Sequence, residues 1–225
     1  MPASSSASRP KSPHLLKALR VALERRGIEL LEHTELKPLP ISTRMQCWET
    51  QAGKRLEADR FVVTSGAWSF ELLRANALKL NIKPMRGQIV LYEQPADGPA
   101  HMVFHEGFYM VPRKDGVLLA GSTLEDVGFD PTTTDSVREE LRIKAEAVLP
   151  SLKGRPILKH WSGLRPGTPE NLPTIAAHPQ IENLFLNTGH FRYGLTMAPC
   201  SAKMIAALVC GETPLHDPTP FAMPV

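Results

Sequence analysis

Apolar residues recur at helical spacing near the start of the chain, between Leu15 and Leu23. This spacing places them on one side of a helix that begins near Ser12. Gly27 follows two arginines, as is typical where a helix ends. The next apolar segment, residues 28–36, predicts a strand. A helix followed directly by a strand indicates an α/β layer.

Two further strands are predicted, from Met45 to Thr50 and from Arg60 to Ser65, with Gly53 in the turn between them. The second contains a continuous apolar run at residues 61–63. Such a run is typical of a strand that is buried on both faces. This strand leads into a short predicted helix that ends near Leu73.

From Lys83 onward the pattern changes to short strands separated by Gly, Pro and Asp turns. This alternation is typical of an antiparallel sheet. A helix then begins at Asp135 and ends before Pro150, with its apolar residues on one face. The strands predicted in this region are residues 88–93, 102–105, 108–112 and 117–121.

The last part of the chain returns to an α/β pattern. Strands are predicted at residues 157–163 and 184–188, and a helix from Pro199 to Val209 stops at Gly211. The fold class is therefore α/β of the mixed α+β kind, although two-sheet folds without a cofactor share this pattern. The boundaries that follow are a disordered tail at 1–11, α/β segments at 12–82 and 161–215, an antiparallel-sheet domain at 83–160 and a tail at 216–225.

Composition narrows the classes of function. A hydrophobic content of 42% over 225 residues supports a substantial core, and a net charge of +3 gives no general field for nucleic acid or a membrane surface. No apolar run reaches the roughly 20 residues of a membrane span. The three cysteines form no CxxC pair and the histidines show no HxH or HExxH spacing. We therefore expect no disulfide framework and no metal site, and a reducing, cytoplasmic location.

Two segments carry specific motifs. Residues 161–169 read WSGLRPGTP, and residues 189–199 read GHFRYGLTMAP and lead into the last predicted helix. With these motifs the chain resembles the D-amino-acid oxidase superfamily of FAD-dependent oxidoreductases, and within it most closely the glycine oxidases of thiamine biosynthesis. The resemblance extends over residues 12–215, with supporting matches at 62–69, 83–88, 109–123 and 173–179.

The resemblance implies a fold and a reaction. Segments 12–82 and 161–215 would form a partial FAD-binding, Rossmann-like domain that is interrupted by the antiparallel-sheet substrate domain. With FAD as cofactor, the CH–NH bond of glycine or of a small amino acid or amine would be oxidised to an imine. Because the flavin accepts the hydride, orientation does much of the protein's work and no catalytic acid–base residue is expected. The expected partner is this small substrate, and assembly into a homo-oligomer stays open.

Arg165 is the main candidate for binding the substrate. Its planar, always-charged fork suits a carboxylate, whereas an arginine that ties down a loop through a nearby acid is the alternative. The resemblance implies that Arg165 clamps the substrate carboxylate and that the hydroxyl of Tyr109 binds the same group. A core tyrosine with its hydroxyl at the rim is the alternative for Tyr109. Arg192 is the third candidate for the substrate site.

The loop around Arg192 is expected to contact the flavin ring. Gly189 and Gly194 allow a close backbone approach, and the following helix directs its N–H groups toward the ligand. Each of these assignments has an alternative. The two glycines could be ordinary turn glycines, and His190 could form a hydrogen bond that anchors the loop. Residues 66–68 could be a generic strand-to-helix turn, and Leu36 could pack in the core. The cofactor-binding residues that the resemblance implies are Gly189, His190, Phe191, Arg192, Tyr193, Gly194, Leu195, Thr196, Gly66, Trp68 and Leu36.

The sequence departs from the superfamily in one major respect. It contains no GxGxxG, the turn that holds the FAD pyrophosphate in this superfamily. We therefore expect the carboxyl-terminal portion of such an oxidase, in which the strands at 28–36 and 60–65 lack a buried neighbour. Two alternatives remain: a relative of D-amino-acid dehydrogenase or sarcosine oxidase, and an inactive fragment or subunit that needs a separate chain to bind the FAD phosphates.

Overall fold

The computed structural model describes residues 12–224, and these residues fall into two compact units. The first unit comprises the chain up to Lys37 together with residues 46–58. The second comprises residues 38–45 and everything from Asp59 onward.

The first unit holds helix α1 (Ser12–Arg25) and a short antiparallel pair of strands, β1 (Cys47–Glu49) and β2 (Arg55–Glu57). Helix α1 ends at the predicted place, because Gly27 adopts a φ of 68° and its N–H bonds back to the carbonyl of Glu24.

The strand predicted at residues 28–36 is wrong. Within the described part of the chain, this segment makes only an isolated bridge between Leu36 and Thr50. His33 has a φ of 54°, which interrupts an extended backbone, and the side chains of Leu30 and Leu31 are 39% and 41% exposed. An apolar run forms a buried strand only where neighbouring strands complete its hydrogen bonds, and the described residues provide no such ladder here.

The second unit contains a five-stranded antiparallel sheet in the order β5-β6-β7-β4-β8. Strand β8 pairs with β4 as far as Gly167, so it starts and ends later than the strand predicted at 157–163 and runs past the domain boundary expected at residue 160. The bounds of the strands are β4 (Lys83–Glu93), β5 (Val103–His105), β6 (Phe108–Pro112), β7 (Val117–Gly121) and β8 (Lys159–Gly167).

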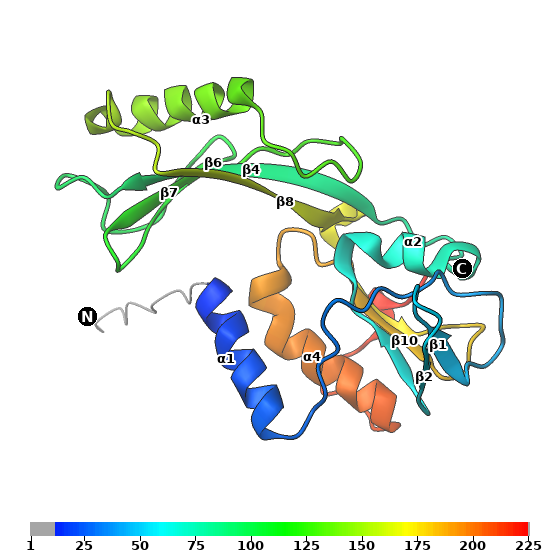
Figure 1. The fold of residues 1–225 in the computed structure, drawn as a ribbon. Coiled ribbons are helices and arrows are strands. Elements are labelled where there is room, and N and C mark those ends of the chain that lie inside the picture. Colours follow the sequence, from blue (N-terminus) through cyan, green and yellow to red (C-terminus); the bar gives the residue numbers. More distant parts are fainter. Residues whose placement is uncertain (1–11, 225) are drawn as a thin grey trace. The chain divides into compact units, whose positions relative to one another are not determined.

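The two faces of this sheet differ in burial because side chains alternate along each strand. One face packs against helix α3 (Asp135–Val148), as Figure 1 shows. The other face carries half-buried side chains, including Ile89, Leu91, Tyr109 and Arg165. The core on the α3 side consists of Val90, Tyr92, Phe108, Met110, Leu118, Ala120, Leu141, Ala145 and Leu152.

The second unit also contains a three-stranded sheet in the order β3-β10-β9. β3 (Phe61–Val63) runs parallel to β10 (Leu184–Thr188), and β9 (Thr174–Ala177) lies antiparallel on the other side of β10. Helix α4 (Gly194–Cys210) packs on this sheet through Met204 and Ile205. Short helical segments complete the unit: η1 (Gly66–Trp68), α2 (Ser69–Leu73), η2 (Arg74–Asn76), η3 (Pro150–Leu152), η4 (Pro169–Asn171) and η5 (Thr219–Phe221).

Helix α4 begins at Gly194, before the predicted start at Pro199. Its first hydrogen bond joins the N–H of Met197 to the carbonyl of Tyr193, so the proline lies near the amino-terminal end of the helix. The preference of proline for the first helical position predicts a start at Pro199, but the structure has this proline inside the helix.

Replacing Gly211 with alanine is expected to destabilise the second unit by about 1 kcal/mol. Gly211 ends α4 in the left-handed region with a φ of 74°, and open space surrounds the position that a Cβ would occupy. The cost is therefore conformational and not steric. Urea unfolding measures it, with Gly163→Ala as the control, because Gly163 is equally open and lies in a strand. Equal stability of the two variants would contradict the prediction.

Candidate active site

Arg165 projects from β8 onto the half-buried face of the five-stranded sheet, and Gly87 of β4 makes room for it. A Cβ built on Gly87 would lie 2.0 Å from Nη1 and 2.4 Å from Cζ of Arg165. The guanidinium group therefore lies directly against the backbone of β4. Only glycine at position 87 permits this approach.

The guanidinium of Arg165 is held by two neutral oxygens. Nη2 donates to the hydroxyl of Ser122 at 2.9 Å, and Nη1 donates to the carbonyl of Thr123 at 3.1 Å. Among residues 12–224, no aspartate or glutamate forms an ion pair with it. The alternative of an arginine tied to a nearby acid therefore has no support in the described part of the chain.

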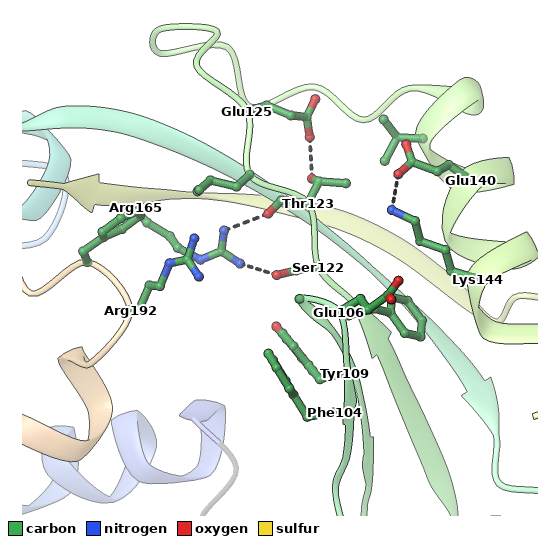
Figure 2. A pocket seen from close by; sticks show the side chains of 15 residues that line it. Phe104, Glu106, Tyr109, Ser122, Thr123, Glu125, Glu140, Lys144, Arg165 and Arg192 are labelled. Carbon is green, nitrogen blue, oxygen red and sulfur yellow. Dashed lines mark hydrogen bonds and ion pairs between the residues drawn. The ribbon is translucent and has the colours of Figure 1, made fainter. Parts of the chain in front are cut away.

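Arg165 shares a cavity of about 680 Å³ with the other two predicted substrate residues, Tyr109 and Arg192. Figure 2 shows Arg165 and Arg192 extending toward one another, Arg165 from β8 and Arg192 from the loop that precedes α4. Phe104 is the cross-strand partner of Tyr109, and the two rings lie parallel in the same view. The three predicted residues thus line one space, and their binding roles stay a prediction.

The loop between β10 and α4 contains a close backbone approach at Gly189. Gly189 has a φ of 79°, and a Cβ there would meet Cγ2 of Thr168 at 2.8 Å. Tyr193 donates its N–H to the carbonyl of His190, and the hydroxyl of Thr196 donates to the carbonyl of Tyr193. The first N–H groups of α4 have no acceptor within the helix. The amino-terminal end of α4 therefore presents N–H donors and the positive end of the helix dipole to the space next to the loop.

His190 lies within this loop with its Nε2 atom buried and without a hydrogen-bond partner. Burial lowers the pKa of His190 below its usual value, so the imidazole is neutral near pH 7. Among the described residues, Nε2 therefore does not anchor the loop by a hydrogen bond. A buried polar atom without a partner is costly in a protein alone and marks a place where a ligand atom can bind.

Replacing His190 with glutamine is expected to reduce the loss of stability in mild acid. The unfolded chain has a histidine pKa of about 6.5, and the folded pKa is lower. As the pH falls, the unfolded state binds the proton first, so stability present above about pH 6.5 is lost below it. Urea unfolding at about pH 7.5 and pH 5.5 tests this difference. Equal losses in both proteins would refute it, because the other histidines are common to both.

Gly66 and Trp68 lie at the carboxyl end of β3, beside the end of β10. The hydroxyl of Thr188 donates to the carbonyl of Gly66 at 3.3 Å and also bonds to the hydroxyl of Ser69. Ligands of parallel sheets bind at such carboxyl ends. Neither Gly66 nor Trp68 lines the cavity around Arg165, and the ring of Trp68 packs 5.7 Å from that of Phe129.

The remaining predicted cofactor residues also lie outside that cavity, except Phe191 and Arg192, which line it. Leu36 belongs to the first unit, where it bridges to Thr50. Gly194 and Leu195 open helix α4. The cofactor role of all of these residues stays a prediction.

Three residues that hold Arg165 in place were not predicted from the sequence: Gly87, Ser122 and Thr123. Each lies in a segment that supports the family resemblance, at 83–88 or 109–123, but neither a backbone carbonyl nor a strand glycine carries a distinctive sequence signal. The described residues contain no cluster of His, Cys, Asp or Glu arranged to hold a metal ion. None of their helices is long and apolar enough to cross a membrane.

The chain is similar to known proteins over most of its length. A family described as FAD dependent oxidoreductase matches residues 9–208. Glycine oxidase of Pseudomonas aeruginosa is 42% identical over 214 residues, which are 94% of this chain and 58% of that protein. The bifunctional protein ThiO/ThiG of Trichormus variabilis is 34% identical over 87% of this chain and 30% of its own length.

Solved structures show the same relationship. Glycine oxidase from Geobacillus kaustophilus superimposes with a TM-score of 0.87 at 30% identity, over 95% of this chain and 58% of that one. The chain thus spans 58% of the length of each of these two glycine oxidases. From the match across residues 9–208, together with this likeness of fold, the chain belongs to the family of FAD-dependent oxidoreductases.

Proposed function

We propose that this chain forms the substrate-binding and flavin-ring-binding part of a glycine oxidase-like enzyme. This enzyme oxidises the CH–NH bond of glycine, or of another small amino acid or amine, to the imine. The observation that carries the proposal is the guanidinium of Arg165, which is held against Gly87 by neutral oxygens and shares its cavity with Tyr109 and Arg192. Relatives named glycine oxidase support it.

Arg165 binds the substrate carboxylate in this proposal. Its bonds to Ser122 and Thr123 each use one of several N–H donors, so the fork retains donors for an anion. A charge-assisted, two-point contact fixes both the position and the plane of a carboxylate. The hydroxyl of Tyr109 adds a third contact, and Arg192 adds a second positive charge to the same cavity.

The residues around α4 fit one edge of a flavin ring. The buried Nε2 atom of His190 lacks a partner, Gly189 permits a close backbone approach, and the first N–H groups of α4 favour an electron-rich edge. Bound FAD would supply the acceptor for the hydride of the substrate. The proposed cofactor contacts of this chain are residues 189–196, Gly66, Trp68 and Leu36.

The chain's contribution to the reaction is orientation. When Arg165 holds the carboxylate, the main motion left to the bound amino acid is rotation about its long axis. In this proposal the walls of the cavity restrict that rotation. Because the hydride leaves with its electron pair, no general base of this chain needs to take the Cα proton. The imine product is released from the same carboxylate contact.

The finer assignments also belong to the proposal. The relatives named ThiO/ThiG support a place in thiamine synthesis, where the oxidised glycine would be consumed. The three cysteines are free in the structure, which supports a reducing, cytoplasmic location. A small amino acid or amine is the proposed partner.

The decisive experiment is purification of the full chain, addition of FAD and an absorbance scan over the flavin bands. Glycine added without oxygen is expected to bleach the bound flavin, and sarcosine and D-alanine test the neighbouring substrate classes. A folded protein that neither retains FAD nor responds to glycine would refute an oxidase made by this chain alone. Recovery of both properties on addition of a GxGxxG-containing chain would instead support a subunit.

A further inference from the structure

The segment that holds Arg165 is itself attached to β4 by hydrogen bonds of both the backbone and the side chains. Glu125 and Arg86 exchange backbone bonds at 2.9 Å in both directions, and the N–H of Thr123 donates to the carbonyl of Gln88 at 3.3 Å. The attachment therefore continues the sheet beyond the end of β7. It brings residues 122–125 alongside the part of β4 that contains Gly87.

Glu125 is the centre of the side-chain contacts in this attachment. Its Oε2 accepts from Nη2 of Arg86 at 2.7 Å, and its Oε1 accepts from the hydroxyl of Thr123 and from Nε2 of Gln88 at 3.0 Å. Burial raises its pKa, but the hydrogen bonds from Thr123, Arg86 and Gln88 outweigh that effect and the pKa is lowered. Glu125 is therefore a carboxylate near neutral pH, with acceptors used on both oxygens.

Thr123 connects this carboxylate to Arg165. Its hydroxyl accepts from the N–H of Gln88 at 2.8 Å and donates to Glu125, while its carbonyl accepts from Nη1 of Arg165. The hydroxyl is thus bonded on both sides, which fixes the residue whose carbonyl aims the guanidinium. Figure 2 shows the sequence of contacts from Glu125 through Thr123 to Arg165.

We propose that Glu125, acting through Thr123, is a positioning residue that fixes the guanidinium of Arg165 in the orientation needed to bind a carboxylate. The proposal rests on the proposed role of Arg165 in substrate binding. Glu125 also lines the cavity, but no hydrogen bond or ion pair among the described residues joins it to the guanidinium of Arg165. It acts by holding the peptide carbonyl that the guanidinium donates to.

A purely structural role for Glu125 is the competing explanation, since it also balances the charge of buried Arg86. Arg86 has a second acidic partner, Asp130, at 2.7 Å, so its charge has two counterions. The bond between Thr123 and Glu125 adds nothing to that balance of charge. A change at Thr123 leaves both acidic partners of Arg86 in place, and it therefore separates positioning from structural support.

Thr123→Val removes the hydroxyl, and with it both the bond to Glu125 and the bond from the N–H of Gln88, with little change in shape. Thr123→Ser retains both bonds. Glu125→Gln tests the other end of the bond. Arg86 and Thr123 donate to different oxygens of the carboxylate, and an amide replaces one of these two acceptors with an NH2 donor. Asp126→Asn is the matched control, because Asp126 is the next acidic residue and its exposed side chain pairs with Lys83 at 3.6 Å.

The first measurement is the exchange rate of the Nη–H protons of Arg165 in the full chain, labelled with ¹⁵N-arginine and identified by their loss in Arg165→Lys. Thr123→Val and Glu125→Gln are each expected to accelerate this exchange about fivefold, the effect of losing one ordinary hydrogen bond. The double variant should be no faster than the single variants, since both changes break the same connection. Thr123→Ser and Asp126→Asn should match the unchanged chain.

An unchanged exchange rate in folded Thr123→Val would overturn the proposal, and so would additive effects in the double variant. This measurement needs neither FAD nor turnover, so it decides the positioning role even if the chain binds no flavin. In the FAD-loaded protein, Thr123→Val should raise KM for glycine about fivefold and leave kcat unchanged. Faster exchange with an unchanged KM would keep the positioning role and refute substrate binding by Arg165.

Discussion

Arg165→Lys is expected to raise KM for glycine about 100-fold in the FAD-loaded protein. Lysine keeps the positive charge but replaces the planar fork with a point charge, so the two-point contact with the carboxylate is lost. Hydrogen bonds to charged groups contribute about 1.5–3 kcal/mol, and 2.7 kcal/mol corresponds to about 100-fold in affinity. Steady-state kinetics over a wide range of glycine concentrations measures the change.

Arg155→Lys is the matched control for this substitution. Arg155 is exposed, and its guanidinium donates to the carbonyl of Ser151, away from the cavity around Arg165. Its replacement should leave KM unchanged. If Arg165→Lys also left KM unchanged, Arg165 would not bind the substrate and the proposed function would lose its main support.

Gly87→Ala is expected to raise KM for glycine about 30-fold without unfolding the protein. The added methyl group would occupy the space of the guanidinium, 2.0 Å from Nη1 of Arg165. The obstructing atoms belong to the end of a flexible side chain, so Arg165 moves aside and the sheet stays intact. The carboxylate then loses most of its oriented contact, at a cost of about 2 kcal/mol.

The control for Gly87→Ala is the directly opposite residue on the neighbouring strand. Gly163 pairs with Gly87 across β4 and β8, but a Cβ there would meet no atom within 4 Å. Gly163→Ala should therefore leave KM unchanged, although it adds the same methyl group to the same face. A similar rise in both variants would mean that the sheet, and not the placement of Arg165, determines KM.

The sequence predicted the regions of the fold where local signals and tertiary contacts agree. The strands at 108–112, 117–121 and 184–188 and the start of α3 at Asp135 are confirmed. The segment at 28–36 failed because an apolar run specifies burial but not the partner that provides it. Strand β8 was predicted too short, since its pairing with β4 determines how far it extends.

The site was predicted less completely than the fold. Arg165, Tyr109 and Arg192 were found from motifs, and the structure brings them to one cavity. The contacts that orient Arg165 could not be found in this way. They depend on a backbone carbonyl at Thr123 and on missing volume at Gly87, and both become visible only when β4, β7 and β8 are in register.

The alternation of side chains along β4 separates two kinds of evolutionary change. Arg86, Gln88, Val90 and Tyr92 face the α3 core or its attachments, whereas Gly87, Ile89 and Leu91 face the open side of the sheet. Substitutions of the second group can alter the face on which Arg165 lies, while the packing against α3 stays untouched. Insertion of a single residue in this strand would exchange the two groups and abolish both properties at once, so selection can adjust the size of these side chains far more freely than the length of the strand.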